Sequence, residues 1–311
     1  MAIKLISIVI PCFNESEVII ETINRLDKCL IDKKYQYEYI FVNDGSKDLT
    51  LKKLCTAKKK NKRIKIVNFA RNFGHQLAVS AGIKFSSGDA IVLIDADLQD
   101  PPELIPSMIK KSEEGFDVVY GQRIFRQGES LFKKITANLF YRIINIISEV
   151  PIPLDTGDFR LITRRVAEDL NNMPENSRFI RGMISWVGYD QCPILYERNK
   201  RFAGETKYPF KKMLHFAIDG ILSFSTKPLR FSIFFGSLIS ITAFLMALYA
   251  VFLRIETNNW VPGWTSIMIA ILFIGGVQLL CIGIIGEYIG KIFYESKNRP
   301  LYIVKDFIGF D

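Results

Sequence analysis

Two patterns of apolar and polar positions alternate over the first 121 residues. Short runs of aliphatic and β-branched residues predict strands, and the longer stretches between them, with apolar residues at helical spacing, predict helices. Strands are predicted over residues 5–11, 39–43, 64–68, 90–94 and 117–120. Helices are predicted over residues 14–30, from about residue 48, over 74–85, and from Pro101-Pro102 onward. Strands that alternate with helices in this way indicate right-handed crossovers and an α/β fold with a mostly parallel sheet.

Two later segments, 231–253 and 265–286, contain no charged residue. Each is close to the roughly 20 residues that cross a bilayer. A pair of buried core helices is the alternative, but such helices are seldom this long and this free of charge. Basic residues flank the pair, whereas the connecting loop carries only Arg254 and Glu256. The positive-inside rule therefore predicts a two-helix transmembrane hairpin with both ends in the cytoplasm and the loop near Trp260 outside.

Two stretches before the hairpin, residues 130–148 and 208–224, have apolar residues at helical spacing with basic residues among them. Amphipathic helices on an ordinary domain surface have the same pattern. Because these stretches precede a membrane anchor, we expect interfacial helices that lie in the membrane surface. The predicted organisation is thus a large domain over 1–229 that includes these helices, a hairpin over 230–290 and a cytoplasmic tail over 291–311.

Composition adds three points. Hydrophobic residues make up 49% of the 311 residues, and the excess lies after Pro228. The formal net charge is +9, which fits either nucleic acid or an anionic membrane surface, and the hairpin favours the membrane over nucleic acid. The five cysteines have no metal-ligand spacing and are interpreted as reduced thiols. Since no signal peptide is visible before the first strand, we expect the large domain to stay in the cytoplasm.

Asp95 and Asp97 follow the apolar run 90–94, at the carboxyl end of a predicted strand. In parallel sheets, ligands bind outside this end of the strands. A divalent cation needs only one or two carboxylates when a substrate diphosphate supplies further oxygens. We predict that Asp95, Asp97 and Gln99 hold Mg²⁺ or Mn²⁺, that the metal neutralises the charge of a departing nucleotide, and that Asp97 is catalytic. The alternative is that these acids cap the helix that begins at Pro101.

Polar residues also follow the first two predicted strands. Asp44 is a candidate acceptor of hydrogen bonds from a base or ribose, although Asn43-Asp44-Gly45-Ser46 is also a favourable Asx-turn sequence. Both roles are compatible, because a turn that fixes Asp44 also orients it. Glu15 is equally suited to cap a helix. No Gly-x-Gly-x-x-Gly or P-loop pattern is present, which disfavours a dinucleotide-binding fold or an NTPase.

A second acidic segment, Asp155 to Arg160, is predicted to be a short polar turn. Asp158 within it is a candidate catalytic base. A phosphate monoester acceptor, however, has a second pKa of about 6 and needs little help to lose a proton. Positioning of the reactants is therefore the alternative role for Asp158.

Several basic residues are candidate ligands of phosphate groups, because guanidinium forks match phosphate oxygens. For an acceptor phosphate the candidates are Arg123, Arg126, Arg142 and Arg160. Simple surface charge is the alternative for each. Arg201 and Lys207 flank residues 203–206, which we expect to form a loop that closes over the diphosphate. The two histidines, His75 and His215, show no triad arrangement and are expected to be structural.

These segments resemble the family 2 glycosyltransferases with the GT-A fold. The closest likeness is to the polyprenyl-phosphate group, which includes dolichyl-phosphate mannose synthases and GtrB-like glucosyltransferases. The segments that carry the resemblance are residues 8–15, 42–46, 95–103, 155–161, 177–189 and 201–213. The first three are typical of the broad superfamily and the last three of the GtrB-like group. Mannose synthases have Ser-Gly-Phe-Arg where this chain has Gly157-Asp158-Phe159-Arg160, which argues against mannose.

The resemblance implies an inverting transfer of glucose from UDP-glucose to undecaprenyl phosphate at the bacterial inner membrane, giving a lipid-linked sugar for glycan modification. Separately, the two spans, with Gly283, Gly286 and Gly290 on one helix face, lead us to expect a homo-oligomer, of which a tetramer is one candidate. The residues that the resemblance assigns to the nucleotide sugar are Pro11, Phe13, Glu15, Val42, Asp44, Asp95, Ala96, Arg201 and Lys207. Two alternatives stay open: the same acceptor with a GDP-mannose or UDP-amino-arabinose donor, and a non-catalytic membrane scaffold or flippase partner.

Overall fold

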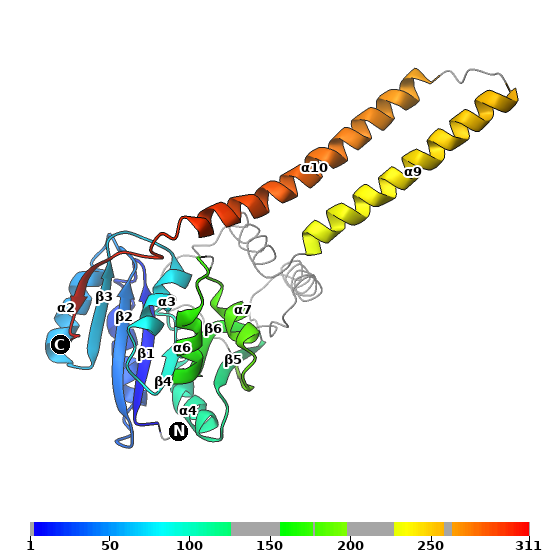
Figure 1. Cartoon of the computed structure of the whole chain (residues 1–311). Coiled ribbons are helices and arrows are strands. Elements are labelled where there is room, and N and C mark those ends of the chain that lie inside the picture. Colours follow the sequence, from blue (N-terminus) through cyan, green and yellow to red (C-terminus); the bar gives the residue numbers. More distant parts are fainter. Residues whose placement is uncertain (1–2, 126–155, 177, 198–226, 258–262, 311) are drawn as a thin grey trace. The chain divides into compact units, whose positions relative to one another are not determined.

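A computed structural model describes residues 3–125, 156–176, 178–197, 227–257 and 263–310 of the chain. The chain divides into two compact units. The first comprises Met1–Phe216 together with Pro300–Asp311, and the second comprises Ala217–Arg299. The sheet and its helices belong to the first unit, and two long helices make up the described part of the second (Figure 1).

One eight-stranded sheet, in the order β7-β5-β6-β4-β1-β2-β3-β8, forms the centre of the first unit. Its strands are β1 (Leu5–Cys12), β2 (Gln36–Asn43), β3 (Ile64–Phe69), β4 (Ala90–Leu93), β5 (Val118–Phe125), β6 (Thr156–Thr163), β7 (Gln191–Glu197) and β8 (Val304–Ile308). Neighbouring strands pair in parallel except around β6, which is antiparallel to β4 and β5, and at β8, which is antiparallel to β3. The predicted α/β class with a mostly parallel sheet is thereby confirmed.

Five of these strands, β1 to β5, were predicted, and the other three were not. The interpretation of residues 155–160 as a polar turn is wrong from residue 156 onward, because β6 begins at Thr156. Its polar side chains alternate with Gly157, Phe159 and Leu161, so the segment has the period of two of a strand with one polar face. Alternation over only six residues, two of them charged, is easily mistaken for a polar loop.

Helices cover both faces of the sheet. They are α1 (Ile19–Cys29), α2 (Thr50–Lys60), α3 (His75–Lys84), α4 (Ile105–Glu113), α6 (Arg164–Asn172), α7 (Ile180–Val187) and the short η1 (Pro102–Leu104). The first of them begins at Ile19 rather than at Asn14 as predicted. Asn14 has a left-handed φ of 54°, and its amide donates to the Ser46 hydroxyl 2.9 Å away, so this residue belongs to a turn.

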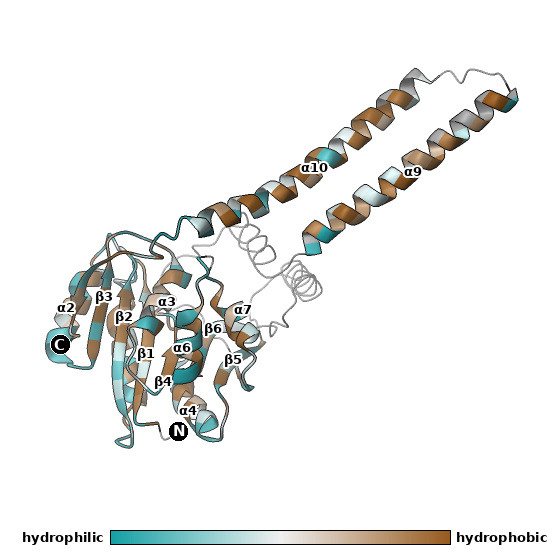
Figure 2. Cartoon of the chain, in the orientation of Figure 1, coloured by the Kyte–Doolittle hydropathy of each residue, from teal (hydrophilic) through white to brown (hydrophobic). Residues whose placement is uncertain are grey.

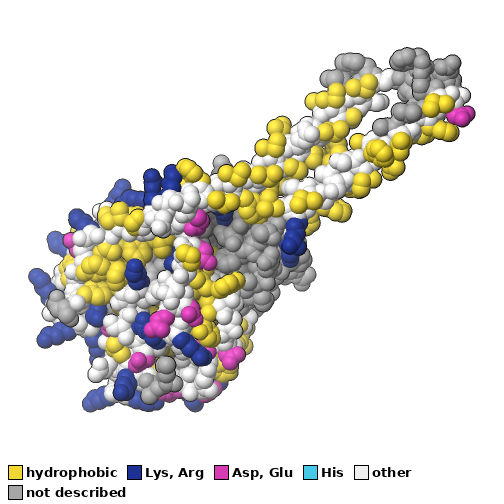
Figure 3. Space-filling model, in the orientation of Figure 1, with side chains coloured by type: hydrophobic (Ala, Val, Ile, Leu, Met, Phe, Trp, Pro, Cys, Tyr) yellow, Lys and Arg dark blue, Asp and Glu magenta, His cyan; other side chains and the backbone are white. Residues whose placement is uncertain are grey.

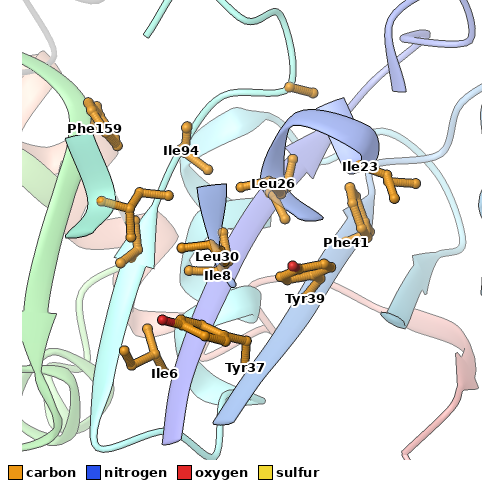
Figure 4. Packing of buried hydrophobic residues seen from close by; sticks show 14 of the residues in the cluster. Ile6, Ile8, Ile23, Leu26, Leu30, Tyr37, Tyr39, Phe41, Ile94 and Phe159 are labelled. Carbon is orange, nitrogen blue, oxygen red and sulfur yellow. The ribbon is translucent and has the colours of Figure 1, made fainter. Parts of the chain in front are cut away.

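The main hydrophobic core lies between one face of the sheet and α1, α2 and α4. Alternate residues of β1 and β2, such as Ile8 and Tyr39, point into it and meet Leu26 of α1 (Figure 4). On the opposite face α3 packs closely against β1. A Cβ added at Gly82 would lie 2.1 Å from Cγ1 of Val9, so only glycine allows this approach of helix to sheet.

The end of the chain returns to the sheet as β8, within the segment predicted to be a tail. The Asn68 side chain on β3 donates to Asp306 at 2.8 Å. The rings of Phe69 and Tyr302 stack with centroids 4.9 Å apart, and Phe85 meets Phe307 edge-on at 4.8 Å. Residues 300–310 therefore close the edge of the sheet next to β3.

The second unit contains α9 (Lys227–Thr257) and α10 (Trp264–Ser296). Apolar residues cover these helices with no continuous polar face, and hydrophobic side chains dominate their visible surface (Figures 2 and 3). Their apolar windows, Leu229–Met246 and Ile269–Ser296, are long enough to cross a membrane, and none of either window is buried. This exposure rules against buried core helices, since long apolar surfaces of this kind are found in contact with lipid or a partner.

Candidate active site

Acidic side chains at the ends of β2, β4 and β6 gather at one edge of the sheet. The carboxyl ends of β1, β2 and β4 meet there, and β6, which runs the other way, begins there. Asp44 follows β2, Asp95 and Asp97 follow β4, and Asp158 lies at the start of β6. The edge predicted from the strand order is therefore the one at which the charged side chains meet.

Asp44 is buried and fixes the loop between β3 and α3. Its carboxylate accepts hydrogen bonds from the amides of Phe73 at 2.6 Å and Gly74 at 2.9 Å and from the side chain of Asn72 at 2.9 Å. Burial raises the pKa of Asp44, and the two amides oppose that shift. Asp44 thus holds the loop that leads into α3, a role that the sequence did not predict, and its predicted role as an acceptor from a base or ribose stays a prediction.

Asp95 and Asp97 differ in their surroundings. The side chain of Asp95 is 31% exposed, and His75 Nε2 lies 3.6 Å from its Oδ1 atom. Asp97 is buried, and its carboxylate accepts the amide of Gln99 at 3.1 Å. Leu98, between Asp97 and Gln99, has a left-handed φ of 58°. This conformation turns the chain so that the Gln99 amide reaches the Asp97 carboxylate.

Asp158 has hydrogen-bond partners on both of its carboxylate oxygens. Arg181 Nε donates to its Oδ1 at 2.6 Å, and His75 Nε2 and Gln76 Nε2 lie 3.0 and 3.2 Å from its Oδ2. Arg181 also donates to the carbonyl of Thr156 at 3.0 Å. Both carboxylate oxygens therefore already have donors from α3 and α7.

Charge coupling shifts the protonation of this cluster. Burial alone would raise the pKa of Asp158, but Arg181 and His75 hold it well below its usual range. Burial likewise lowers the pKa of His75, yet Asp95 and Asp158 outweigh it and raise that pKa to about 9. Burial is the main cause that raises the pKa of Asp95, to about 6. His75 opposes this shift, and the neighbouring acids add to it. At neutral pH the cluster holds a charged imidazolium beside an ionised Asp158.

Arg160 lies on the same face of β6 as Asp158 and is buried. Its Nη2 donates to the carbonyl of Gly157 at 2.8 Å, and its buried Nε has no hydrogen-bond partner among the described residues. Burial lowers the pKa of Arg160 to about 10, against the attraction of Asp158. This guanidinium is a cation inside the protein rather than a surface charge.

Arg123 belongs to a separate cluster on the opposite face of β6. Its Nη2 lies 3.3 Å from Oδ1 of Asp100, and its Nε lies 3.1 Å from the hydroxyl of Tyr196, which itself donates to Asp100. A Cβ at Gly157 would lie 2.6 Å from Nη2 of Arg123, so the guanidinium occupies space that glycine leaves open.

The remaining predicted site residues are placed as follows. Pro11, Val42 and Ala96 are buried, whereas Phe13 and Glu15 are half-buried. The Ala96 carbonyl accepts the hydroxyl of Thr22 at 2.8 Å. Outside the described residues lie Arg126, Arg142, Arg201 and Lys207, and with them the predicted interfacial helices over 130–148 and 208–224.

Sequence analysis did not single out Gln76 or Arg181, and it expected His75 to be structural. The structure places His75 Nε2 3.0 Å from Asp158 and 3.6 Å from Asp95. The position of His75 near the acids was predictable from the sequence. His75 opens the helix that follows the third strand, and this helix begins at the same sheet edge as the acids. Arg181 carries no comparable signal in the sequence, since it comes from α7, which connects two unpredicted strands.

The residues present fit a divalent cation that is held partly by a substrate. Among the described residues no group of three or more acidic, histidine or cysteine side chains forms a metal cage. Two carboxylates and an amide oxygen from Asp95, Asp97 and Gln99 are instead the partial ligand set that suffices for Mg²⁺ or Mn²⁺ beside a diphosphate.

Comparison with known proteins gives a consistent picture. The glycosyl transferase family 2 model matches residues 7–170, and the GtrB C-terminal hairpin model matches residues 227–292. An uncharacterized glycosyltransferase of Bacillus subtilis is 48% identical over 98% of this chain and 94% of its own. The bactoprenol glucosyl transferase of Shigella phage SfV is 40% identical over 97% of this chain and 98% of its own. In Escherichia coli, a prophage bactoprenol glucosyl transferase homolog is 40% identical over 96% and 98%.

Proposed function

The chain belongs to glycosyl transferase family 2, and from that premise we propose that it transfers glucose from UDP-glucose to a polyprenyl phosphate such as undecaprenyl phosphate. The chain is a glycosyltransferase, and what we propose is the identity of its donor and its acceptor. The observation that carries it is the combination, in one chain, of an acidic site at the carboxyl ends of the strands with an exposed apolar hairpin. A lipid acceptor explains both at once, because its phosphate must meet a water-soluble donor at the membrane surface.

The relatives support glucose and the lipid. Two of them, at 40% identity over nearly their whole length, are named as bactoprenol glucosyl transferases or homologs. The hairpin model that bears the GtrB name matches α9 and most of α10. Gly157-Asp158-Phe159-Arg160, which departs from the mannose synthase pattern, is in keeping with a glucosyl donor.

In this proposal the acids after β4 bind the donor's diphosphate through a divalent cation. Asp95, Asp97 and Gln99 are the ligands, and the cation, when bound, neutralises the charge that develops on the departing UDP. Asp44 holds the loop that begins α3, and the nucleotide lies against that loop and the residues Pro11, Phe13 and Glu15. The backbone of Val42 and Ala96 completes the floor, since both side chains are buried.

The acceptor requires little proton transfer, because a phosphate monoester is largely ionised at neutral pH. Asp158 is occupied on both oxygens and is held ionised by Arg181 and His75. We assign it the positioning of these two cations near the reacting groups rather than the abstraction of a proton. Arg123 and Arg160, with Arg126 and Arg142 from the part of the chain outside the described residues, supply positive charge for the acceptor phosphate.

The membrane arrangement follows from charge. With α9 and α10 across the bilayer, basic residues lie near the start of α9 and near the end of α10. By the positive-inside rule, they favour the cytoplasmic side for both termini and for the catalytic unit. The stretches 130–148 and 208–224, with Arg201 and Lys207, lie outside the described residues, and the interfacial helices and the loop over the donor stay predictions from the sequence. Small residues Gly283, Gly286 and Gly290 on one face of α10 permit close helix contacts in a homo-oligomer, for which a tetramer is a candidate.

The test is a direct assay of the purified, membrane-reconstituted protein. It is supplied with undecaprenyl phosphate, Mg²⁺ or Mn²⁺, and UDP-glucose, GDP-mannose or a UDP-amino-arabinose donor in parallel, and the lipid extract is analysed by mass spectrometry. We expect a hexosyl phosphate lipid from UDP-glucose alone. Product from another donor only would replace the donor and keep the acceptor, and product from none would overturn the proposal.

A further inference from the structure

Three side chains that are distant in sequence form one buried cluster on the face of β6 opposite to Asp158. Asp100 follows the metal-ligand segment by one residue, Arg123 lies on β5, and Tyr196 lies on the edge strand β7. The side chains of Asp100 and Arg123 are 1% and 14% exposed. One oxygen of Asp100 accepts hydrogen bonds from both Arg123 and Tyr196, and Tyr196 also pairs with Nε of Arg123.

The neighbouring backbone leaves room for this cluster. A Cβ at Gly157 would meet Nη2 of Arg123 at 2.6 Å, and a Cβ at Gly121 would meet the ring of Tyr196 at 2.8 Å. Both glycines lie in strands, where glycine is unfavourable for folding. The space they provide is therefore used to seat the guanidinium and the phenol.

Folding stability is a poor explanation for the cluster. Burying an ion pair costs about as much in desolvation as it returns, and a hydrophobic replacement is often at least as stable. The second oxygen of Asp100, Oδ2, is buried without a hydrogen-bond partner among the described residues, which adds to the cost. An arrangement that is unfavourable for stability, and that joins the metal-ligand segment to a cation at the start of β6, indicates a role in function.

We infer that Asp100 and Tyr196 are positioning residues that hold the Arg123 guanidinium at the start of β6, where it binds the phosphate of the lipid acceptor. The inference rests on the proposed function and deepens it. Because Asp100 directly follows the segment that holds the donor diphosphate, the cluster sets the distance between the donor site and the acceptor phosphate. Arg123 touches the substrate, and the other two residues act through it.

The first test removes one hydroxyl. In Tyr196→Phe, Arg123 loses the partner of its Nε atom, and we expect the KM for undecaprenyl phosphate to rise about tenfold or more, the scale of a hydrogen bond to a charged group. The KM for UDP-glucose should change less than twofold. Tyr189→Phe is the matched control, because the Tyr189 hydroxyl also donates to a carboxylate, that of Asp169 at 2.7 Å, away from the site. This control should leave both KM values unchanged.

A second variant reaches the same guanidinium while leaving the side chains of its partners unchanged. Gly157→Ala places a methyl group against Nη2 of Arg123 and should raise the acceptor KM in the same way. Adding Tyr196→Phe to Arg123→Ala should cost little beyond Arg123→Ala alone, because the hydroxyl acts through the arginine.

The outcomes separate this inference from the proposed function. If wild-type protein forms no lipid product, the proposed function fails. If wild-type protein forms product while Tyr196→Phe and Gly157→Ala both keep the normal acceptor KM, the positioning role is overturned and the proposed function stands. Additive losses in the double variant would likewise overturn it, since they would show that Tyr196 acts independently of Arg123.

Discussion

His75 and Asp158 are 83 residues apart in the sequence, and His75 Nε2 lies 3.0 Å from a carboxylate oxygen of Asp158. The histidine opens α3 and the aspartate lies at the start of β6, so the pair joins two elements across the site edge. The same imidazole lies 3.6 Å from Asp95. A single cation thus links the acid assigned to the metal with the acid assigned to positioning.

Replacing His75 by alanine should lower kcat/KM for glucosyl transfer by roughly 10- to 100-fold, because a hydrogen bond to a charged group is worth about 1.5–3 kcal/mol. The loss follows from two changes, the missing donor to Asp158 and the missing positive charge beside Asp95. Steady-state kinetics measure it, with the thermal unfolding midpoint as a check that the fold persists. A folded variant with wild-type kcat/KM would show that the pair has no part in transfer.

Asp97→Asn should abolish transfer to within the detection limit while leaving the protein folded. The substitution keeps the shape of the side chain and its bond to the Gln99 amide, but it removes the charge that a divalent cation requires. Chelation of divalent ions in the wild-type assay should have the same effect, and added Mg²⁺ or Mn²⁺ should restore activity. Full activity of wild-type protein in excess chelator would contradict the metal assignment.

Glu38 offers a test of pH-dependent stability away from the site. It is buried and accepts hydrogen bonds from Ser7 at 2.5 Å and the Ser87 amide at 2.7 Å, and it pairs with Lys65 at 2.7 Å. Burial alone would raise the pKa of Glu38, but these partners lower it. A carboxyl whose pKa is lower in the folded state stabilises the protein above its unfolded-state pKa. That contribution is lost as the pH falls through the folded-state pKa.

Glu38→Gln should therefore reduce the free energy of unfolding at pH 7 by about 1–3 kcal/mol, the cost of weakening hydrogen bonds to a buried charge. Its deficit relative to wild type should begin to shrink as the pH falls below about 4.5, where the carboxyl of unfolded wild-type protein is protonated, and should shrink further as folded Glu38 is protonated at lower pH. Thermal unfolding of both proteins from pH 7 to pH 3.5 measures this. The exposed Glu113, which pairs with Lys34, provides the control, and Glu113→Gln should change little. A deficit that is constant over this range would exclude the charge of Glu38 as its cause.

The five strands from β1 to β5 were predictable because strands buried on both faces are continuous apolar runs in the sequence. β6 was not predicted because one of its faces carries polar side chains, which interrupt the apolar run. These are Thr156, Asp158 and Arg160, which belong to the site. Acids that follow a strand directly, such as Asp95 and Asp97, were predictable from strand order alone. The partners of Asp158 were not, since Arg181 meets it only through the packing of α7.

β8 was also not predicted, because its local sequence does not mark it as a strand. Val304 to Ile308 is short, three of its five residues are exposed and two of these are charged, and nothing local distinguishes it from a tail. Its identity as a strand comes from pairing with β3, the hydrogen bond between Asn68 and Asp306, and the stacking of Tyr302 on Phe69. These contacts connect sequence positions more than 230 residues apart.

Deleting residues 300–311 should consequently destabilise the catalytic unit rather than trim a free tail. The deletion would expose the edge of β3, and an open strand edge with apolar neighbours promotes aggregation. We expect a thermal unfolding midpoint several degrees lower, on the scale of roughly 2–4 °C per kcal/mol for a domain of this size, and loss of monodisperse protein in size-exclusion chromatography. Asp306→Ala, which removes only the bond to Asn68, is the milder comparison and should lower the midpoint less. A truncated protein with the wild-type midpoint and full activity would mean that β8 is dispensable, and that the sheet is complete at β3.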